Sequence, residues 1–176
     1  MKRGIVAVVL MSCIALILVA GSGGTVPLDP EKMPEVVAAT FRAVFPNGTI
    51  QKLDVAEENG VMVYDFEFTA GAREKETDII GDGTMIESTL VITRADIPPA
   101  AMKTILKHAR GATMGRMEWI ETFYDLEGGK AVKLPKSKIT YAVELTRPKQ
   151  TAEVMVDPAG KVTEAPVWTP KPGQAK

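Results

Sequence analysis

Residues 62–69 read Met-Val-Tyr-Asp-Phe-Glu-Phe-Thr, and this stretch decides the predicted fold. Successive side chains of a β-strand point to opposite faces. One face of this strand would carry Met62, Tyr64, Phe66 and Phe68, and the other would carry Asp65, Glu67 and Thr69. The alternation therefore predicts a half-buried strand with one polar face.

A second stretch of the same kind lies at residues 139–145. Here Ile139, Tyr141, Val143 and Leu145 alternate with Thr140, Ala142 and Glu144. Each stretch has a helical pattern upstream and a strand bounded by turns downstream. The chain is therefore predicted to contain two units built in the same order.

Both upstream helices are predicted from apolar stripes. The first starts at Asp29-Pro30 or at Pro34, and its stripe of Val37, Phe41 and Val44 ends before Pro46-Asn47-Gly48. The second spans residues 95–109, with its prolines in the first turn and Gly111 after its end.

The remaining segments are predicted to be strands and turns. Asn59-Gly60 is a typical hairpin turn ahead of the central strand. Residues 73–80 alternate in charge, which predicts a solvated edge strand. Residues 125–138 contain a Gly-Gly pair and four lysines, and are expected to form an exposed loop or a hairpin extension.

The N-terminus resembles an export signal. Lys2 and Arg3 precede an apolar run at residues 5–20, and small residues follow it, so we expect residues 1–24 to be a signal peptide with its linker. The alternatives are an uncleaved anchor, or a lipoprotein in which Cys13 is lipidated. Residues 167–176 are rich in proline and are expected to be a disordered tail.

The charge balance argues against nucleic-acid binding. The formal net charge is −1, and removal of Lys2 and Arg3 would make it −3. Proteins that bind nucleic acids neutralise phosphates with clustered Lys and Arg, and no basic block is present here. A nucleic-acid-binding role is therefore set aside.

The two predicted units can be aligned with each other. An offset of 64 places Met33-Pro34 over Ile97-Pro98, and after an insertion an offset of 77 places Tyr64 over Tyr141 and Gly83 over Gly160. This predicts an α+β fold of two helix-on-antiparallel-sheet repeats, at residues 28–94 and 95–166.

The aligned residues carry a family resemblance. A hydrophobic residue with proline opens each helix, a tyrosine lies in each central strand, and an Asp/Gly turn closes each unit. This pattern resembles the PepSY and PepSY-like domains of bacterial envelope proteins, a superfamily that includes tandem β-lactamase-inhibitor folds. The resemblance implies an exported module, some relatives of which inhibit peptidases or other enzymes. It implies no catalytic residue.

No catalytic, cofactor or metal site is predicted. His108 is the only histidine, and a nucleophile needs a base within hydrogen-bond reach. A copper(I) site made of His108, Met114 and Met117 is conceivable, but both methionines align with Ile50 and Leu53 and are expected to fill a core.

The predicted binding surface is the sheet face turned away from the helices. Trp119 or Tyr124 is expected on it because their strand is apolar on both sides, and Asp65, Glu67 and Glu144 would share that face. We expect a non-enzymatic periplasmic or secreted binding module that inhibits or regulates an envelope peptidase or another protein. The alternatives are a periplasmic metal or small-ligand sensor and a structural envelope protein.

Overall fold

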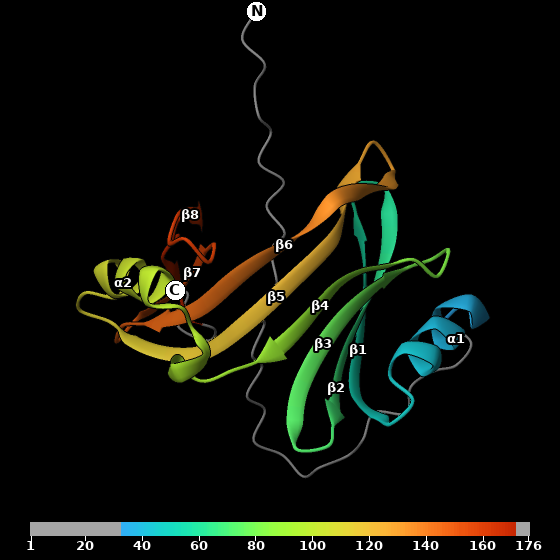
Figure 1. The fold of residues 1–176 in the computed structure, drawn as a ribbon, viewed down its shortest axis with the longest axis horizontal. Coiled ribbons are helices and arrows are strands. Elements are labelled where there is room, and N and C mark those ends of the chain that lie inside the picture. Colours follow the sequence, from blue (N-terminus) through green and yellow to red (C-terminus); the bar gives the residue numbers. More distant parts are fainter. Residues whose placement is uncertain (1–32, 172–176) are drawn as a thin grey trace, which may run out of the picture.

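The chain, seen in a computed structural model that describes residues 33–171, folds around one antiparallel sheet (Figure 1). The sheet has nine strands. Strands β1 to β8 lie side by side in chain order, and β9 pairs with β7. The elements are α1 (Glu35–Val44), β1 (Gly48–Glu58), β2 (Val61–Ala70), β3 (Arg73–Ile80), β4 (Met85–Val91), the 3-10 turn η2 (Arg94–Asp96), α2 (Pro99–His108), β5 (Thr113–Glu127), β6 (Lys130–Thr146), β7 (Gln150–Val156), β8 (Val162–Glu164) and β9 (Thr169–Pro170).

The expected α+β fold of two helix-on-sheet repeats is wrong. Strands β4 and β5 pair with each other, from Glu87 opposite Thr122 to Val91 opposite Glu118. The strands before and after η2 therefore belong to a single sheet, and the two helices are only ten residues each. The division of the chain into two units at residues 28–94 and 95–166 remains a prediction. The proposed signal peptide and Cys13 lie outside the described residues, as do residues 172–176 of the expected disordered tail. Residues 169–170 of that tail form strand β9, which pairs with β7.

Both helices cover the same face of this sheet. One row of directly opposed residues crosses six strands, and it consists of Phe68, Lys75, Leu90, Trp119, Tyr141 and Val156. Phe68 packs with Phe41 of α1, whereas Tyr141 and Val156 belong to the buried cluster around Ile105 of α2. Directly opposed side chains share a face, so α1 and α2 lie on one side.

The α1 half has an aromatic core. The ring centroids of Phe41 and Phe66 are 4.6 Å apart in a stacked arrangement, and Phe68 meets Phe41 edge-on at 5.0 Å. Of the two predicted starts for this helix, the structure has the later one, since Pro34 is the N-cap residue. The alternation at residues 62–69 places the three aromatic side chains of β2 under α1, as predicted.

Each helix is also held by a hydrogen bond to a turn glycine. Thr40 of α1 donates to the carbonyl of Gly83 at 2.9 Å, and Thr104 of α2 donates to the carbonyl of Gly160 at 2.8 Å. Both glycines have positive φ, +88° and +84°. A Cβ on Gly160 would lie 2.4 Å from the carbonyl oxygen of Ala100, so only glycine permits this close approach.

Strand β3 is not the solvated edge strand that its charges predicted. It pairs with β2 on one side and β4 on the other, so its acidic residues lie inside the sheet. Residues 125–138 do form the expected hairpin extension, within β5 and β6. A register shift between Thr122 and Tyr124 bends this hairpin, and Leu126 packs with Val63, Ile80 and Ile86 on the helix-free face.

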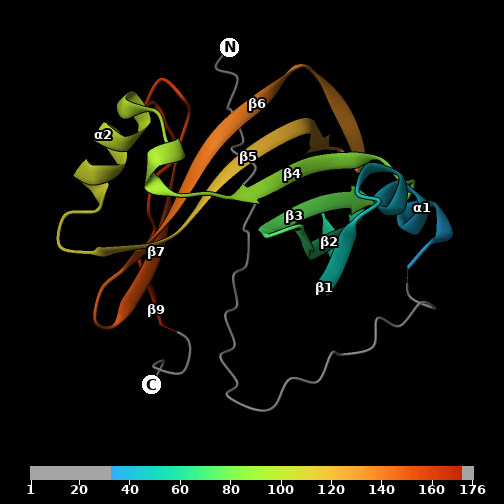
Figure 2. The same cartoon turned by 60° about the horizontal axis from the view of Figure 1, so that its bottom comes forward.

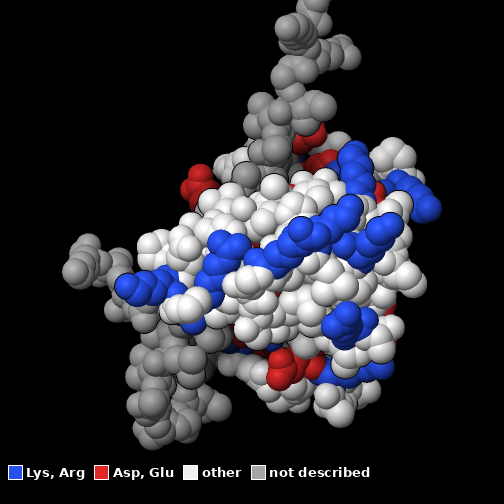
Figure 3. Space-filling model, turned by 90° about the vertical axis from the view of Figure 1, so that its left-hand side faces the viewer, with Lys and Arg blue, Asp and Glu red and all other residues white. Residues whose placement is uncertain are grey.

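The surface of the α2 side is basic. Lys and Arg side chains form a stripe across it (Figure 3). Among residues 33–171, neither helix combines the length and the hydropathy that crossing a membrane requires.

Candidate functional site: the concave sheet face

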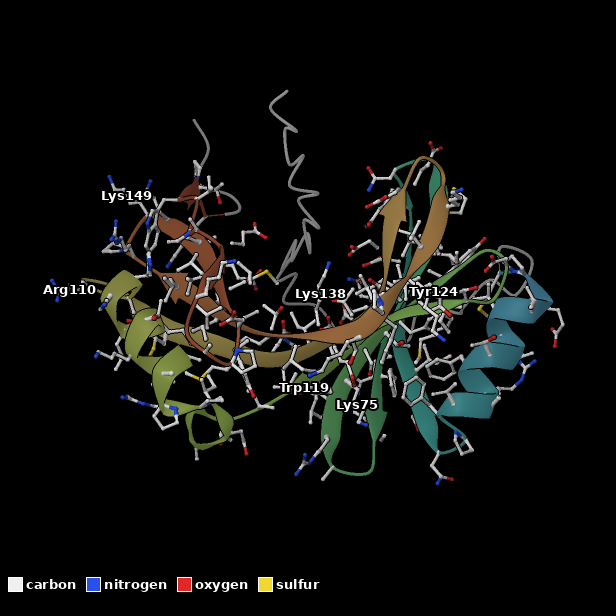
Figure 4. All side chains as sticks on the ribbon, turned by 45° about the horizontal axis from the view of Figure 1, so that its top comes forward. Lys75, Arg110, Trp119, Tyr124, Lys138 and Lys149 are labelled. Atoms are coloured by element: carbon white, nitrogen blue, oxygen red, sulfur yellow. The ribbon has the colours of Figure 1, made fainter. Side chains whose placement is uncertain are left out.

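The sheet bends into an arch, with α1 and α2 on its outer side at opposite ends (Figures 2 and 4). The inner, concave face carries no helix. Labelled side chains illustrate the two sides, because Trp119 and Lys75 point outward whereas Tyr124 and Lys138 lie on the inner side (Figure 4). The cross-strand register now assigns every other position of each strand to the concave face.

A row of acidic residues crosses the concave face. Asp54 on β1 is directly opposite Asp65 on β2, Asp65 is opposite Asp78 on β3, and Asp78 is opposite Glu87 on β4. The row ends on β5, where Thr122 lies opposite Glu87. Like charges placed directly opposite each other destabilise a sheet. An arrangement of four such residues in series is therefore costly for folding.

Neighbouring rows add further acids. The adjacent row pairs Lys52 with Glu67 and Glu67 with Glu76. On the other half of the arch, Glu144 lies opposite Glu153. The acidic residues of the concave face include Asp54, Glu58, Asp65, Glu67, Glu74, Glu76, Asp78, Glu87, Glu118, Asp125, Glu144, Glu153 and Glu164. Basic side chains on the same face include Lys52, Arg116 and Lys138.

Burial makes several of these carboxylates hard to ionise. Burial, followed by the charges of Glu67 and Asp54, raises the pKa of Asp65 to about 6. Burial raises the pKa of Glu87 to about 7, and burial with the nearby charge of Glu118 raises that of Glu76 to about 7. The pKa of Asp78 is raised well above its usual range by burial and by Glu87. Near neutral pH the face is therefore only partly ionised.

Two basic side chains form ion pairs with acidic residues of the concave face. The guanidinium of Arg116 donates to Glu74 at 3.1 Å and also contacts Glu76 and Glu118. The side chain of Glu118 is only 6% exposed, so this contact neutralises a buried acid. At the β1 edge, Lys52 donates to Glu67 at 2.8 Å and contacts Asp54.

A small cavity lies where the bent hairpin meets the acidic row. Its volume is about 170 Å³, and it is lined by Asn59, Ile86, Glu87, Thr122, Tyr124, Asp125, Leu126 and Lys138. The Thr122 hydroxyl donates to Glu87 at 2.9 Å, and Lys138 Nζ pairs with Asp125 at 2.8 Å. Drug-sized ligands need about 300–1,000 Å³. The cavity therefore has room for a single side chain rather than for a whole cofactor.

The structure brings four of the five predicted binding residues to the concave face. Asp65 and Glu67 lie in the acidic rows of β2, and Glu144 lies on β6 opposite Glu153. Tyr124 packs against the cluster of Val63, Ile80, Ile86 and Leu126 beside the cavity.

Trp119 lies on the other face. It pairs with Tyr141 and packs against the core beneath α2, so it does not belong to the concave surface. Met114 and Met117 pack against the same core. Within residues 33–171, no three His, Cys, Asp or Glu side chains converge as metal ligands would.

Sequence reasoning missed the centre of this site. Glu76, Asp78 and Glu87 were absent from the predicted surface because the first two were assigned to an exposed edge. A usable signal was present, since Glu74, Glu76 and Asp78 share one parity, as Asp65 and Glu67 do on the preceding strand. Two consecutive strands with acids on one parity place those acids on one face.

The arch has relatives among solved structures. A BLIP-like protein from Bacteroides fragilis matches with a TM-score of 0.54 and 11% identity, covering 82% of this chain and 92% of the other. A DUF2874 family protein from Bacteroides uniformis matches with a TM-score of 0.55 and 16% identity, covering 74% and 86%. The fold is BLIP-like.

A third similar structure is a protein from Bacteroides eggerthii, provisionally assigned to the periplasm, with a TM-score of 0.57 and 12% identity, covering 78% of this chain and 88% of that one. No protein-family model matches the sequence, and no curated protein does. At these identities the likeness establishes the fold alone. The PepSY resemblance and the internal repeat remain predictions.

Proposed function

We propose that this chain is an exported, non-enzymatic binding module that takes a protein partner against its concave face. The observation that carries the proposal is the row of Asp54, Asp65, Asp78 and Glu87 across the open side of the sheet. Such a row opposes folding, and a partner with complementary charge would relieve the repulsion. The BLIP-like fold of an inhibitor-like neighbour agrees with a protein-binding role.

The partner surface that fits best presents Lys or Arg side chains. Asp65 would then gain a cation from the partner, and Glu76 would gain one in addition to Arg116. In a partly desolvated interface such pairs fix register and specificity. The cavity beside Glu87 and Tyr124 has room for one such side chain. If the partner is an envelope peptidase whose active site lies beneath the bound sheet, inhibition would follow from steric occlusion.

Site-specific photo-crosslinking tests this proposal in envelope fractions. A photoreactive residue is placed at Glu67 or Glu144 on the concave face, and at Lys75 on the outer face as the matched control. The expected result is one shared crosslinked species from both concave positions that is missing at Lys75.

A charge-neutral variant then tests the role of the acids. Substituting Asp65→Asn and Glu76→Gln should abolish this crosslink, whereas neutralising exposed Glu35 and Glu127 should leave it intact. Equal crosslinking from both faces, or a crosslink insensitive to the concave substitutions, would contradict the proposed binding face.

A further inference from the structure

The outer face of α2 forms a second surface that the concave site does not use. A shallow, open depression on it is lined by Pro99, Met102, Lys103, Leu106, Lys107 and Arg110. These positions recur every three or four residues and therefore share one side of the helix. Leu106 is 41% exposed, and the three basic side chains around it are exposed as well.

The turn between β6 and β7 extends this basic surface. Arg147 Nη2 donates to the carbonyl of Arg110 at 3.3 Å, and its guanidinium lies 3.8 Å from the ring centroid of Trp168. Exposed Lys149 lies in the same turn, at the same end of the molecule as Arg110 (Figure 4). The helix end and the turn are thereby joined into one basic face on the α2 side, where Figure 3 shows a stripe of Lys and Arg side chains.

Within residues 33–171, no acidic side chain forms an ion pair with Lys103, Lys107, Arg110 or Lys149. The ion pairs that the described residues do form involve Arg42, Lys52, Arg116 and Lys138. The first turn of α2 contains no Asp or Glu. Helix dipoles favour bases in a last turn, which explains Lys107, but not Lys103 in the middle of the helix or Lys149 outside it.

We propose that the basic face of α2 docks on an anionic membrane surface. Lys103, Lys107, Arg110 and Lys149 would lie against lipid phosphates, and Leu106 would enter the headgroup layer. An exposed apolar residue ringed by Lys and Arg on a helix is the pattern of interfacial helices. The depression is open and shallow, which suits an extended surface better than an enclosed small ligand. Docking there would leave the concave face free for a protein partner.

Vesicle co-sedimentation of the full chain tests this inference. Partitioning is measured against lipid concentration on vesicles of phosphatidylcholine alone and on vesicles in which roughly a third of the lipid is anionic phosphatidylglycerol, whose negative surface potential attracts clustered Lys and Arg. The apolar run at residues 5–20 can bind both vesicle types, so the measured quantity is the ratio of the two partition coefficients.

The decisive variant replaces Lys103, Lys107, Arg110 and Lys149 with Gln. Each removed charge should lower the ratio about five-fold, so the four together should lower it more than 100-fold. The matched control replaces exposed Arg73, Lys130, Lys133 and Lys136 with Gln, removes the same net charge, and should change the ratio less than about five-fold. Far-UV circular dichroism verifies that both variants are folded.

Other occupants of the face would give different results. If inorganic phosphate releases the protein from anionic vesicles more than sodium chloride of equal ionic strength does, the face holds a single phosphate site. If the protein shows no preference for anionic vesicles but self-associates in sedimentation velocity, and only the α2 variant abolishes this self-association, the face binds a second copy of the chain. An acidic protein partner would likewise leave no vesicle preference. Each of these results, or equal losses in both variants, would overturn the membrane proposal.

Discussion

Neutralising Glu87 should stabilise the protein at pH 8 and have little effect at pH 5. Glu87 lies within the concave acidic row and accepts a hydrogen bond from Thr122 at 2.9 Å. Glutamine has nearly the same shape, and its side-chain oxygen can accept the same hydrogen bond. Glu87→Gln therefore removes the charge and changes little else.

The sign follows from the direction of the pKa change. Burial raises the pKa of Glu87 from 4.5 to about 7 in the folded protein. The folded state then binds the proton more tightly than the unfolded chain, so unfolding releases a proton between these pH values. Stability from this group is complete below pH 4.5 and is lost as the pH rises through 7.

The expected magnitude is a few kilocalories per mole. One pKa unit corresponds to 1.36 kcal/mol, so the full change amounts to roughly 3 kcal/mol, and relaxation around the charge lowers this to about 2–3 kcal/mol. At pH 8 the free energy of unfolding of Glu87→Gln should exceed that of the wild type by that amount. At pH 5 the difference should be less than about 1 kcal/mol.

Urea denaturation at the two pH values, followed by circular dichroism, measures these differences. Exposed Glu127→Gln, at the end of β5, is the matched control and should change stability by less than about 0.5 kcal/mol at both pH values. The wild type itself should lose stability from pH 5 to pH 8, because Asp65 and Glu76 also have raised pKa values. A gain that is equal at both pH values, or a wild type that becomes more stable toward pH 8, would refute the reasoning.

Three further substitutions test packing and charge by the same denaturation assay. Gly160→Ala should lower the free energy of unfolding by about 2–4 kcal/mol, because the new Cβ would collide with α2. Gly111 also has positive φ but has open space around it, so Gly111→Ala should lower the free energy of unfolding by only about 1 kcal/mol. Equal losses would contradict the close approach of Gly160 to α2. Arg116→Gln should lower the free energy of unfolding by about 3 kcal/mol at pH 8, and by less at pH 5, where Glu76 is protonated. Arg42→Gln breaks only an exposed ion pair and should lower it by less than about 0.5 kcal/mol. Phe66→Ala should cost about 3–5 kcal/mol because the ring is fully buried, and a smaller loss would show that the core collapses around it.

Local patterns identified most elements but not how the strands combine. The alternation at residues 62–69 and the Asn59-Gly60 turn predicted β2 and its hairpin correctly. The pairing of β4 with β5 joins segments separated by α2, and periodicity carries no information about such partners. Charged strands usually lie at sheet edges, so β3 was misplaced although its parity was readable.

The candidate site was predictable to a similar degree. Asp65, Glu67 and Glu144 were assigned to the helix-free face from parity alone, and they lie there. Trp119 could not be assigned because β5 is apolar on both parities. A register shift between Met114 and Met117 changes which positions of β5 face α2, and no pattern in the sequence predicts this shift.

The two threonine hydrogen bonds described above have a mechanical consequence. Thr40 ties α1 to the turn at Gly83, and Thr104 ties α2 to the turn at Gly160, so each helix braces strands on its own side of the β4–β5 seam. Neither bond crosses the seam, where five residue pairs join the strands. The seam is instead spanned on the concave face by Arg116 of β5, which contacts Glu74 and Glu76 of β3. Loss of that single guanidinium would therefore weaken the joint between the two halves of the arch while leaving both helix braces intact.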